Sequence, residues 1–141
     1  MKTITTTILA ISLAAAAGVA SAQETMTEQD VRAALTGEGY THLDDVEFDD
    51  GLWKADARSA DGNRLEVRID PATGKIYPST AVATLSAQDI HARLDAAGYT
   101  GVHDIEFDDG LWKAEAVDAQ GREVDLKLDP ESGEVISAQH E

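Results

Sequence analysis

Cysteine is absent from this chain of 141 residues. Without cysteine the protein forms no disulfide bond, performs no thiol chemistry and carries no cysteine-linked lipid anchor. Histidine is scarce as well, and the four histidines at positions 42, 91, 103 and 140 occupy no equivalent places in the repeat described below. The sequence therefore offers few residues that could form a catalytic nucleophile with a neighbouring base. We expect no enzyme activity, no catalytic residues and no cofactor.

Basic residues are few. Eleven lysines and arginines stand against 27 aspartates and glutamates, which gives a formal net charge of −16. A protein of this charge without a basic cluster is repelled by nucleic acid and by anionic membranes, so neither is an expected partner. A cationic partner is favoured instead, either a metal ion, a basic peptide or a basic protein surface. Solubility alone is the simpler interpretation of the same charge.

No hydrophobic run is long enough to cross a bilayer. The one apolar stretch, Ile8 to Ala17, follows Lys2 and precedes the small residues Ala20-Ser21-Ala22. A positive start, a short apolar stretch and a small-residue cleavage pattern are typical of a secretory signal peptide. We predict cleavage near Ala22 and a mature protein that is periplasmic, or secreted, without insertion in a membrane.

The rest of the chain contains an internal repeat. Residues 27–79 and 86–138 align without a gap and are identical at about 23 of 53 positions. The longest identical segment is Phe48 to Ala55 against Phe107 to Ala114. The predicted organisation is a signal peptide 1–22, a first repeat 23–79, a linker 80–85, a second repeat 86–138 and a C-terminal tail 139–141.

Each repeat is predicted to begin with a short helix. Thr27 with Asp30, and Ser86 with Asp89, have the spacing of a capping box, in which a hydroxyl and a carboxylate satisfy the first N–H groups of a helix. Apolar residues four positions apart give each helix one narrow buried stripe, and a glycine follows its last turn. A helix of about three turns is marginal alone and needs a sheet to lie on.

Alternating apolar and charged residues predict four strands after each helix. Paired strands must place their apolar residues on one face, so the turns fix the register. A two-residue Asp50-Gly51 turn places Phe48 opposite Trp53, and a three-residue second turn places Ala57 opposite Leu65. The predicted fold class is α+β, with two repeats that each pack one helix on a four-stranded antiparallel meander. Because one such unit is marginally stable, we expect the two to pack together or to share a sheet.

This order of helix, strands and turns resembles the PepSY domain. The first repeat carries Gly51-Leu52-Trp53-Lys54-Ala55-Asp56 and Asp70-Pro71-Ala72-Thr73-Gly74-Lys75-Ile76, and the second carries Gly110-Leu111-Trp112-Lys113-Ala114-Glu115 and Asp129-Pro130-Glu131-Ser132-Gly133-Glu134-Val135. The resemblance covers nearly all of the predicted mature chain, as a tandem pair. It implies an exported bacterial α+β module without catalytic residues. Such domains occur in the propeptides of thermolysin-like metallopeptidases, in membrane proteins and as small periplasmic proteins, and restraint of peptidases has been proposed for them.

Two acidic turns invite comparison with calcium-binding loops. Asp49-Asp50-Gly51 and Asp108-Asp109-Gly110 lack the alternating oxygen ligands and the closing glutamate of an EF-hand. Asp-Gly is also the pair that a type I′ turn requires. We therefore interpret both segments as turns, and Asp70 and Asp129 as residues that hydrogen-bond the turns that follow them.

The predicted register also aligns carboxylates on the solvent face of each sheet. The two rows are Asp45, Asp56 and Glu66 in the first repeat and Asp104, Glu115 and Asp125 in the second. Like charges side by side destabilise a sheet, so these rows suggest weak binding of a divalent cation or of a basic partner. A solvated face screened by salt is the alternative interpretation.

Strand parity separates the aromatic residues into two groups. Trp53 and Trp112 have inward parity, which predicts packing in the core against Phe48 and Phe107 rather than stacking on a ligand. Tyr77 has outward parity, is predicted to be exposed, and is the one aromatic candidate for contact with a partner.

Two function hypotheses follow. The first is an exported, non-enzymatic PepSY-type binding or regulatory protein that restrains a peptidase or another exported or membrane protein. The alternative is a periplasmic protein that binds divalent cations through the acidic rows.

Overall fold

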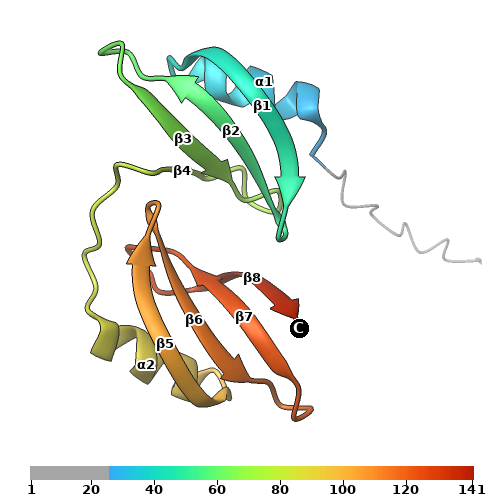
Figure 1. Ribbon diagram of the computed structural model, residues 1–141, viewed down its shortest axis with the longest axis vertical. Helices are drawn as coiled ribbons and strands as arrows, with labels where there is room; N and C mark the ends of the chain where they lie inside the picture. The colour runs from blue at the N-terminus through green and yellow to red at the C-terminus, as the bar shows by residue number, and fades with distance from the viewer. Residues whose placement is uncertain (1–25) are drawn as a thin grey trace, which may run out of the picture.

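The computed structural model describes residues 26–141 (Figure 1). The predicted signal peptide, residues 1–22, lies outside this range. Along the chain the elements are α1 (Glu28–Gly37), β1 (Thr41–Asp49), β2 (Leu52–Arg58), β3 (Arg64–Ile69), β4 (Ile76–Pro78), α2 (Ala87–Ala96), β5 (Thr100–Asp108), β6 (Leu111–Val117), β7 (Glu123–Leu128) and β8 (Val135–His140). This order confirms the predicted α+β class. No helix of the described residues is long and apolar enough to span a membrane.

Both helices begin as predicted. Thr27 Oγ1 accepts a hydrogen bond from the Asp30 N–H, while the Asp30 carboxylate accepts one from the Thr27 N–H. Ser86 and Asp89 form the same reciprocal pair at the start of α2. The carboxylates lie at the positive end of the helix dipole, and their pKa values are lowered, chiefly by hydrogen bonds from the hydroxyl and the N–H of Thr27 to Asp30 and from the N–H and the hydroxyl of Ser86 to Asp89. The capping boxes thus fix where each helix starts.

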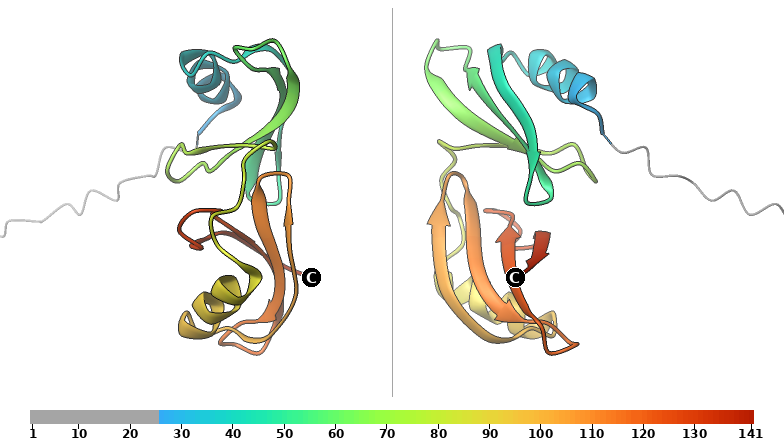
Figure 2. Two further views of the ribbon diagram at one scale, coloured as in Figure 1. Left: turned by 90° about the vertical axis from the view of Figure 1, so that its left-hand side faces the viewer. Right: turned by 45° about the vertical axis from the view of Figure 1, so that its right-hand side comes forward.

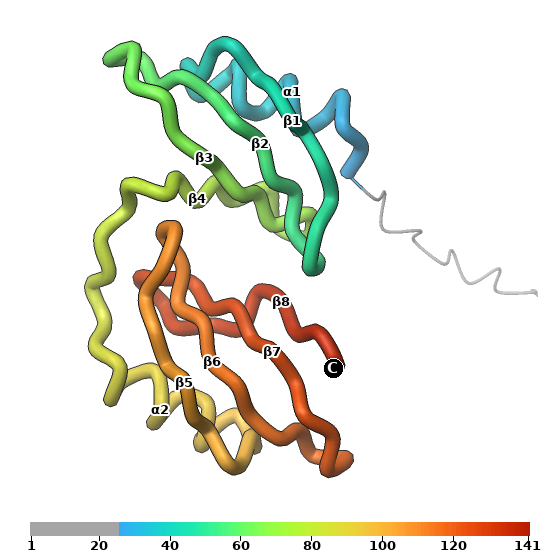
Figure 3. The backbone as a smooth tube through the Cα atoms, in the orientation of Figure 1, coloured from blue at the N-terminus to red at the C-terminus, as the bar shows by residue number. Residues whose placement is uncertain are grey.

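The strands form two separate antiparallel sheets, in the orders β1-β2-β3-β4 and β5-β6-β7-β8 (Figure 3). Of the two expected arrangements, packing of the repeats is therefore the one observed. Ala57 pairs with Leu65 and Phe48 pairs with Trp53, as predicted. Asp50 and Gly51 both have positive φ, the geometry of a type I′ turn, which matches the twist of the flanking strands.

Each helix covers the apolar face of its own sheet. The left-hand view of Figure 2 shows both helices on the same side of the two sheets. The helix side chains that face the sheets, Val31, Leu35, Ile90 and Leu94, are at most 1% exposed. The strands contribute Ala55, Ala57, Leu65, Val67 and Ile69 to the first core and Trp112, Ala114, Ala116, Val124, Leu126 and Leu128 to the second. The alanines in the middle strands leave room for the helix backbone.

The first strand of each sheet departs from the predicted register. Asp56 lies opposite Asp44, not opposite Asp45, because β1 contains two register shifts and Asp45 is bulged at φ +49°. The second repeat shows the same shift, with His103 in the row in place of Asp104. The predicted rows are therefore corrected by one residue at this end. Each bulge inserts one residue, so Leu43 and Val46, which both pack on the core, lie three positions apart instead of two, a spacing that the predicted alternation did not include.

The aromatic residues follow the prediction in part. Trp112 is 7% exposed and Trp53 is half-buried. Each lies edge-on to its partner phenylalanine, Phe107 or Phe48, with ring centroids 5.4 Å apart. Phe48 itself is 54% exposed. The prediction for Tyr77 is wrong, because this side chain is only 3% exposed: the second repeat packs against the face that carries it.

The segment between the repeats is anchored at one end. Thr84 donates its N–H to the carbonyl oxygen of Pro130, and Ala83 and Leu85 pack against the second core. Val82, in contrast, is 81% exposed. The predicted tail 139–141 begins inside a strand, since β8 continues to His140.

Candidate functional site: the inter-repeat contact and the open sheet faces

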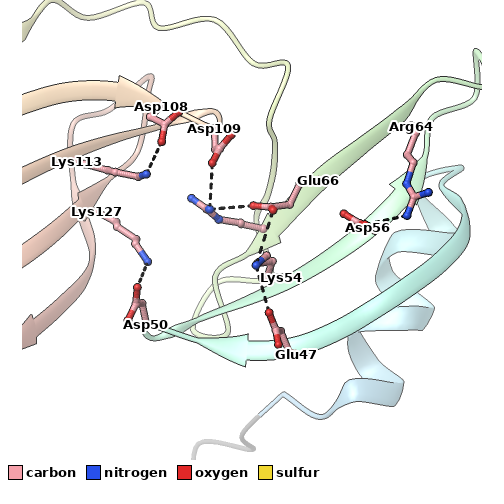
Figure 4. Close-up of polar contacts among 11 residues, drawn as sticks. Glu47, Asp50, Lys54, Asp56, Arg64, Glu66, Asp108, Asp109, Lys113 and Lys127 are labelled. Atoms are coloured by element: carbon pink, nitrogen blue, oxygen red, sulfur yellow. Dashed lines mark hydrogen bonds and ion pairs between the residues drawn. The ribbon is translucent and has the colours of Figure 1, made fainter.

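Charged residues at equivalent positions of the two repeats form ion pairs across the contact between them. Asp50 and Asp109 are 59 positions apart, as are Arg68 and Lys127. Lys127 Nζ lies 2.9 Å from Asp50 Oδ2, and Arg68 Nη2 lies 3.4 Å from Asp109 Oδ2. Each acidic turn therefore binds the third strand of the other sheet (Figure 4). The turns predicted from Asp-Gly also have a function in assembly, which their local sequence does not show.

An apolar cluster lies at the centre of this contact. Leu52, Tyr77 and Leu111 are at most 3% exposed, and Ile136 packs against them. Leu52 and Leu111 are equivalent positions of the two repeats, and so are Tyr77 and Ile136. The contact is therefore close to self-complementary, as in an isologous dimer of two single repeats.

Asp129 forms the buried polar part of the contact. Its Oδ2 accepts hydrogen bonds from Lys75 Nζ at 2.6 Å and from the Tyr77 hydroxyl at 3.0 Å, while its Oδ1 accepts from the N–H groups of Glu131 and Ser132. Burial alone raises the pKa of Asp129, but these donors outweigh it and lower the pKa to about 2. Burial and the Asp129 carboxylate raise the pKa of Tyr77. The predicted turn role of Asp129 is correct, and the cross-repeat role is additional.

A hollow of about 620 Å³ lies between the repeats. Its charged lining residues are Asp49, Asp50, Lys54, Arg68, Asp104, Glu106, Lys113, Glu115, Asp125 and Lys127. The four cations are already occupied: Lys113 contacts Asp108 at 2.5 Å and Lys54 contacts Glu47 at 3.2 Å, in addition to the two cross-repeat pairs (Figure 4). The hollow thus offers its carboxylates, rather than its cations, to a ligand.

The first acidic row is largely neutralised. Asp56 pairs with Arg64 at 3.1 Å, and Glu66 pairs with Arg68 at 2.9 Å (Figure 4). Asp45, displaced by the bulge, lines a shallow depression together with Asp56 and Glu66. This row therefore has little need of an external cation.

The second acidic row differs by one charge reversal. Glu123 occupies the position equivalent to Arg64. Glu115 therefore has no counterpart of the ion pair between Asp56 and Arg64, and its basic neighbour is His103. Lys127, the equivalent of Arg68, binds Asp50, so Asp125 also forms no ion pair with a lysine or arginine within residues 26–141. The open face of the second sheet is therefore the more acidic of the two.

His103 is a site residue that the sequence analysis missed. Its Nε2 lies 3.2 Å from Glu115 Oε2 and 3.8 Å from Asp104 Oδ2. Its Nδ1 lies 2.8 Å from the carbonyl oxygen of Gly101, which can only accept, so Nδ1 carries a proton. The bond to Gly101 is the main cause that raises the pKa of His103, and Asp104 and Glu115 add to it. The bulge places this histidine in the row, and the parity of an unbroken strand does not.

A family model for the peptidase propeptide and YPEB domain matches the chain twice, at residues 3–80 and 81–139. The first match contains α1 and β1 to β4, and the second contains α2 and β5 to β8 except the last residue of β8. A solved structure, the YpmB protein from Bacillus subtilis, is similar at 19% sequence identity with a TM-score of 0.35, and the alignment covers 80% of this chain and 96% of that one. No curated protein matches.

Proposed function

The chain belongs to the PepSY family of peptidase propeptide and YPEB domains, of which it contains a tandem pair, and from this membership we propose an exported, non-catalytic regulatory protein. It acts by binding another extracytoplasmic protein, and the family description favours a peptidase as that partner. The signal-like segment 1–22 supports export.

The observation that carries the proposal is the acidic open face of the second sheet. Five carboxylates on this face form no ion pair with a lysine or arginine in the part of the chain that the structure describes: Asp104, Glu106, Glu115, Glu123 and Asp125. Like charges gathered in this way repel one another, and a basic surface on a partner relieves that repulsion. Electrostatic complementarity of this kind also accelerates association.

The two repeats supply a reciprocal test. Glu123 and Arg64 occupy equivalent positions, so Glu123→Arg and Arg64→Glu each introduce a residue that the same fold already accommodates. We expect the immobilised protein to capture a partner from an extracytoplasmic extract, and the free protein to slow peptide hydrolysis by a thermolysin-like metallopeptidase. Glu123→Arg should weaken both effects, whereas Arg64→Glu should preserve or strengthen them.

Two results would count against this function. Capture of nothing above background, together with undiminished peptidase activity, would contradict a role in binding. Equal capture by both variants at low and high salt would contradict the acidic face as the binding surface, because charge contacts weaken with ionic strength.

A second candidate function is binding of a divalent cation, and one group of side chains favours it. His103, Asp104 and Glu115 each offer a ligand atom, and these atoms lie within 4.8 Å of one another. The Nδ1–H bond to Gly101 leaves Nε2 toward the carboxylates, the arrangement that a backbone carbonyl imposes on metal-binding histidines. We propose this trio, and not the first repeat, as the cation site.

Calorimetric titration with zinc, calcium and magnesium tests the cation site. A metal binds neutral imidazole, and the pKa of His103 is raised from 6.5, so zinc binding should strengthen as the pH rises through that pKa. We expect His103→Gln to abolish the zinc heat and Asp56→Asn, in the first repeat, to leave it unchanged. Absence of heat with all three metals, or an unchanged zinc heat in Glu115→Gln, would eliminate this function.

A further inference from the structure

The two sheets have four edge strands, and three of them are poorly suited to pairing with another chain. β1 and β5 each contain two register shifts. β4 is only three residues long and ends at Pro78. Bulges, short strands and proline are the features by which proteins protect sheet edges from strand addition.

β8 is the exception among the described strands. After one irregularity at its start, it pairs without interruption with β7 from Ser137 to His140. It lies at the margin of the second sheet (Figure 1). Its backbone N–H and C=O groups hydrogen-bond no described element other than β7, and its polar contact with the first repeat is made by a side chain, the Ser137 hydroxyl, which donates to the carbonyl oxygen of Asp50. One side of its backbone is therefore available to a further strand.

We propose that β8 is a strand-addition site for an extended basic segment of a partner protein. The inference rests on the proposed function, since it names the part of the chain that binds the partner and the conformation of the partner segment that is bound. The main-chain N–H and C=O groups on the free side of β8 supply the hydrogen bonds, and side chains at alternate positions supply the selectivity.

The charges around β8 select a basic segment. Asp125 lies directly opposite Gln139 of β8, and Glu123 lies further along the same strand, whereas Lys127, opposite Ser137, is paired with Asp50 of the first repeat. Glu134 precedes β8 and Glu141 follows it. None of these four carboxylates pairs with a lysine or arginine within residues 26–141. Lysine or arginine side chains on an added strand lie within reach of this group, whereas an acidic strand is repelled.

A second copy of the chain is the main competing occupant. Two β8 strands placed side by side bring together two copies of the same acidic surroundings. Like charges in that position are unfavourable, which argues against a continuous sheet through two copies.

Amide hydrogen exchange followed by NMR tests the proposal directly on the whole protein. The probe is a short capped peptide of alternating lysine and valine, and the control is the same peptide with glutamate in place of lysine. We expect the lysine peptide to slow exchange at alternate amides of β8 by about tenfold or more, as new backbone hydrogen bonds do. The glutamate peptide should leave these amides unchanged.

Two prolines identify the free side of the strand. Neighbouring residues of an antiparallel strand turn their N–H groups to opposite sides, so Ala138→Pro and Gln139→Pro differ in which N–H they remove. The variant that keeps β7 amides protected has lost a free N–H, and its affinity for the lysine peptide should fall about tenfold. If both variants unfold, Glu141→Lys replaces them, because it leaves the backbone intact and should weaken lysine-peptide binding.

The outcomes separate this inference from the proposed function. Protection by the lysine peptide only outside β8 overturns strand addition. Concentration-dependent protection of β8 without peptide, with formation of dimers, identifies a second copy as the occupant and overturns it too. A natural partner that still binds the β8 variants leaves the proposed function standing without this site. Peptide binding at β8 with no captured partner supports the site and contradicts the function.

Discussion

Tyr77 and Asp129, 52 residues apart in the chain, share a hydrogen bond of 3.0 Å that is buried between the two repeats. Lys75 donates to the same carboxylate oxygen, and the Asp129 side chain is only 6% exposed. The bond joins the fourth strand of the first sheet to the turn before the last strand of the second. Charge at Asp129 is therefore coupled to the association of the repeats.

Asp129 predicts a loss of stability in acid. Its pKa falls from 3.8 to about 2 on folding, so the ionised carboxylate stabilises the folded state above pH 3.8. This contribution disappears as the pH falls through about 2. The shift corresponds to about 2 kcal/mol. We expect Asp129→Asn to be less stable by about that amount at neutral pH, and to approach the wild type near pH 2, in urea unfolding at a series of pH values.

Asp70 is the matched control for this experiment. It occupies the equivalent position in the first repeat and accepts hydrogen bonds from the Ala72 N–H and the Thr73 hydroxyl. Within the described residues it has no bond to the other repeat. Asp70→Asn keeps an acceptor for the turn and should therefore cost less. An equal, pH-independent loss in both variants would show that the contact between the repeats is not what Asp129 stabilises.

The sequence was sufficient for those features that depend on local rules. Phe48 lies opposite Trp53 because an Asp-Gly pair favours a type I′ turn, and Thr27 begins a helix because Asp30 completes its capping box. The bulge at Asp45 was missed because a strict alternation was assumed before Val46, whereas the three-residue spacing from Leu43 to Val46, both packed on the core, indicates the extra residue. The acidic row was therefore placed correctly on its face but one residue off at β1.

Burial of Tyr77 lies beyond what strand parity can show. Alternation tells which face of its own sheet a residue occupies, and Tyr77 is on the face away from the helix, as predicted. It does not tell whether a second repeat covers that face. The same holds for Lys127, whose Asp50 partner is 77 residues away. The burial of Tyr77 and the ion pair of Lys127 become clear only from the structure, in which the acidic turn of each repeat lies against the other repeat.

Leu52 and Leu111 are expected to couple the unfolding of the two repeats. Each is at most 1% exposed in the small cluster between the repeats. Replacement by alanine should cost about 2–5 kcal/mol, because a cavity remains where the side chain was. Leu94→Ala is the control, since Leu94 lies in the core of the second repeat alone. In calorimetry, Leu52→Ala and Leu111→Ala should split the transition into two, whereas a single transition in both would contradict a coupling role.

The two tryptophans predict unequal effects of the same substitution. Trp53 Nε1 donates to the carbonyl oxygen of Met26 at 3.1 Å. Trp112 Nε1 is buried and has no partner in the described part of the chain. Trp53→Phe should therefore cost about 1 kcal/mol more than Trp112→Phe, because only the first loses a hydrogen bond. Denaturant unfolding followed by the fluorescence of the remaining tryptophan measures both, and equal losses would contradict the assignment.

The turn glycines test the contact between the repeats at the level of the backbone. Gly110 has φ +79°, and a Cβ there would clash with the carbonyl oxygen of Pro78 in the other repeat. Gly121 also has φ +79°, but a Cβ there meets nothing within 4 Å. Gly121→Ala therefore measures backbone strain alone, about 1 kcal/mol, and the difference between the two variants measures the clash.

The destabilisation caused by Gly51→Ala should lie between those caused by Gly121→Ala and Gly110→Ala. A Cβ at Gly51 would lie 2.7 Å from Ser137 Oγ, the end of a short side chain that can rotate away, whereas the Pro78 carbonyl is backbone and cannot. We expect destabilisation to increase from Gly121→Ala through Gly51→Ala to Gly110→Ala, with the last costing about 1–3 kcal/mol beyond strain. Urea unfolding gives the order. Equal destabilisation by Gly110→Ala and Gly121→Ala would mean that the turn at Gly110 does not contact the first repeat in solution. That result would contradict the contact between the two repeats.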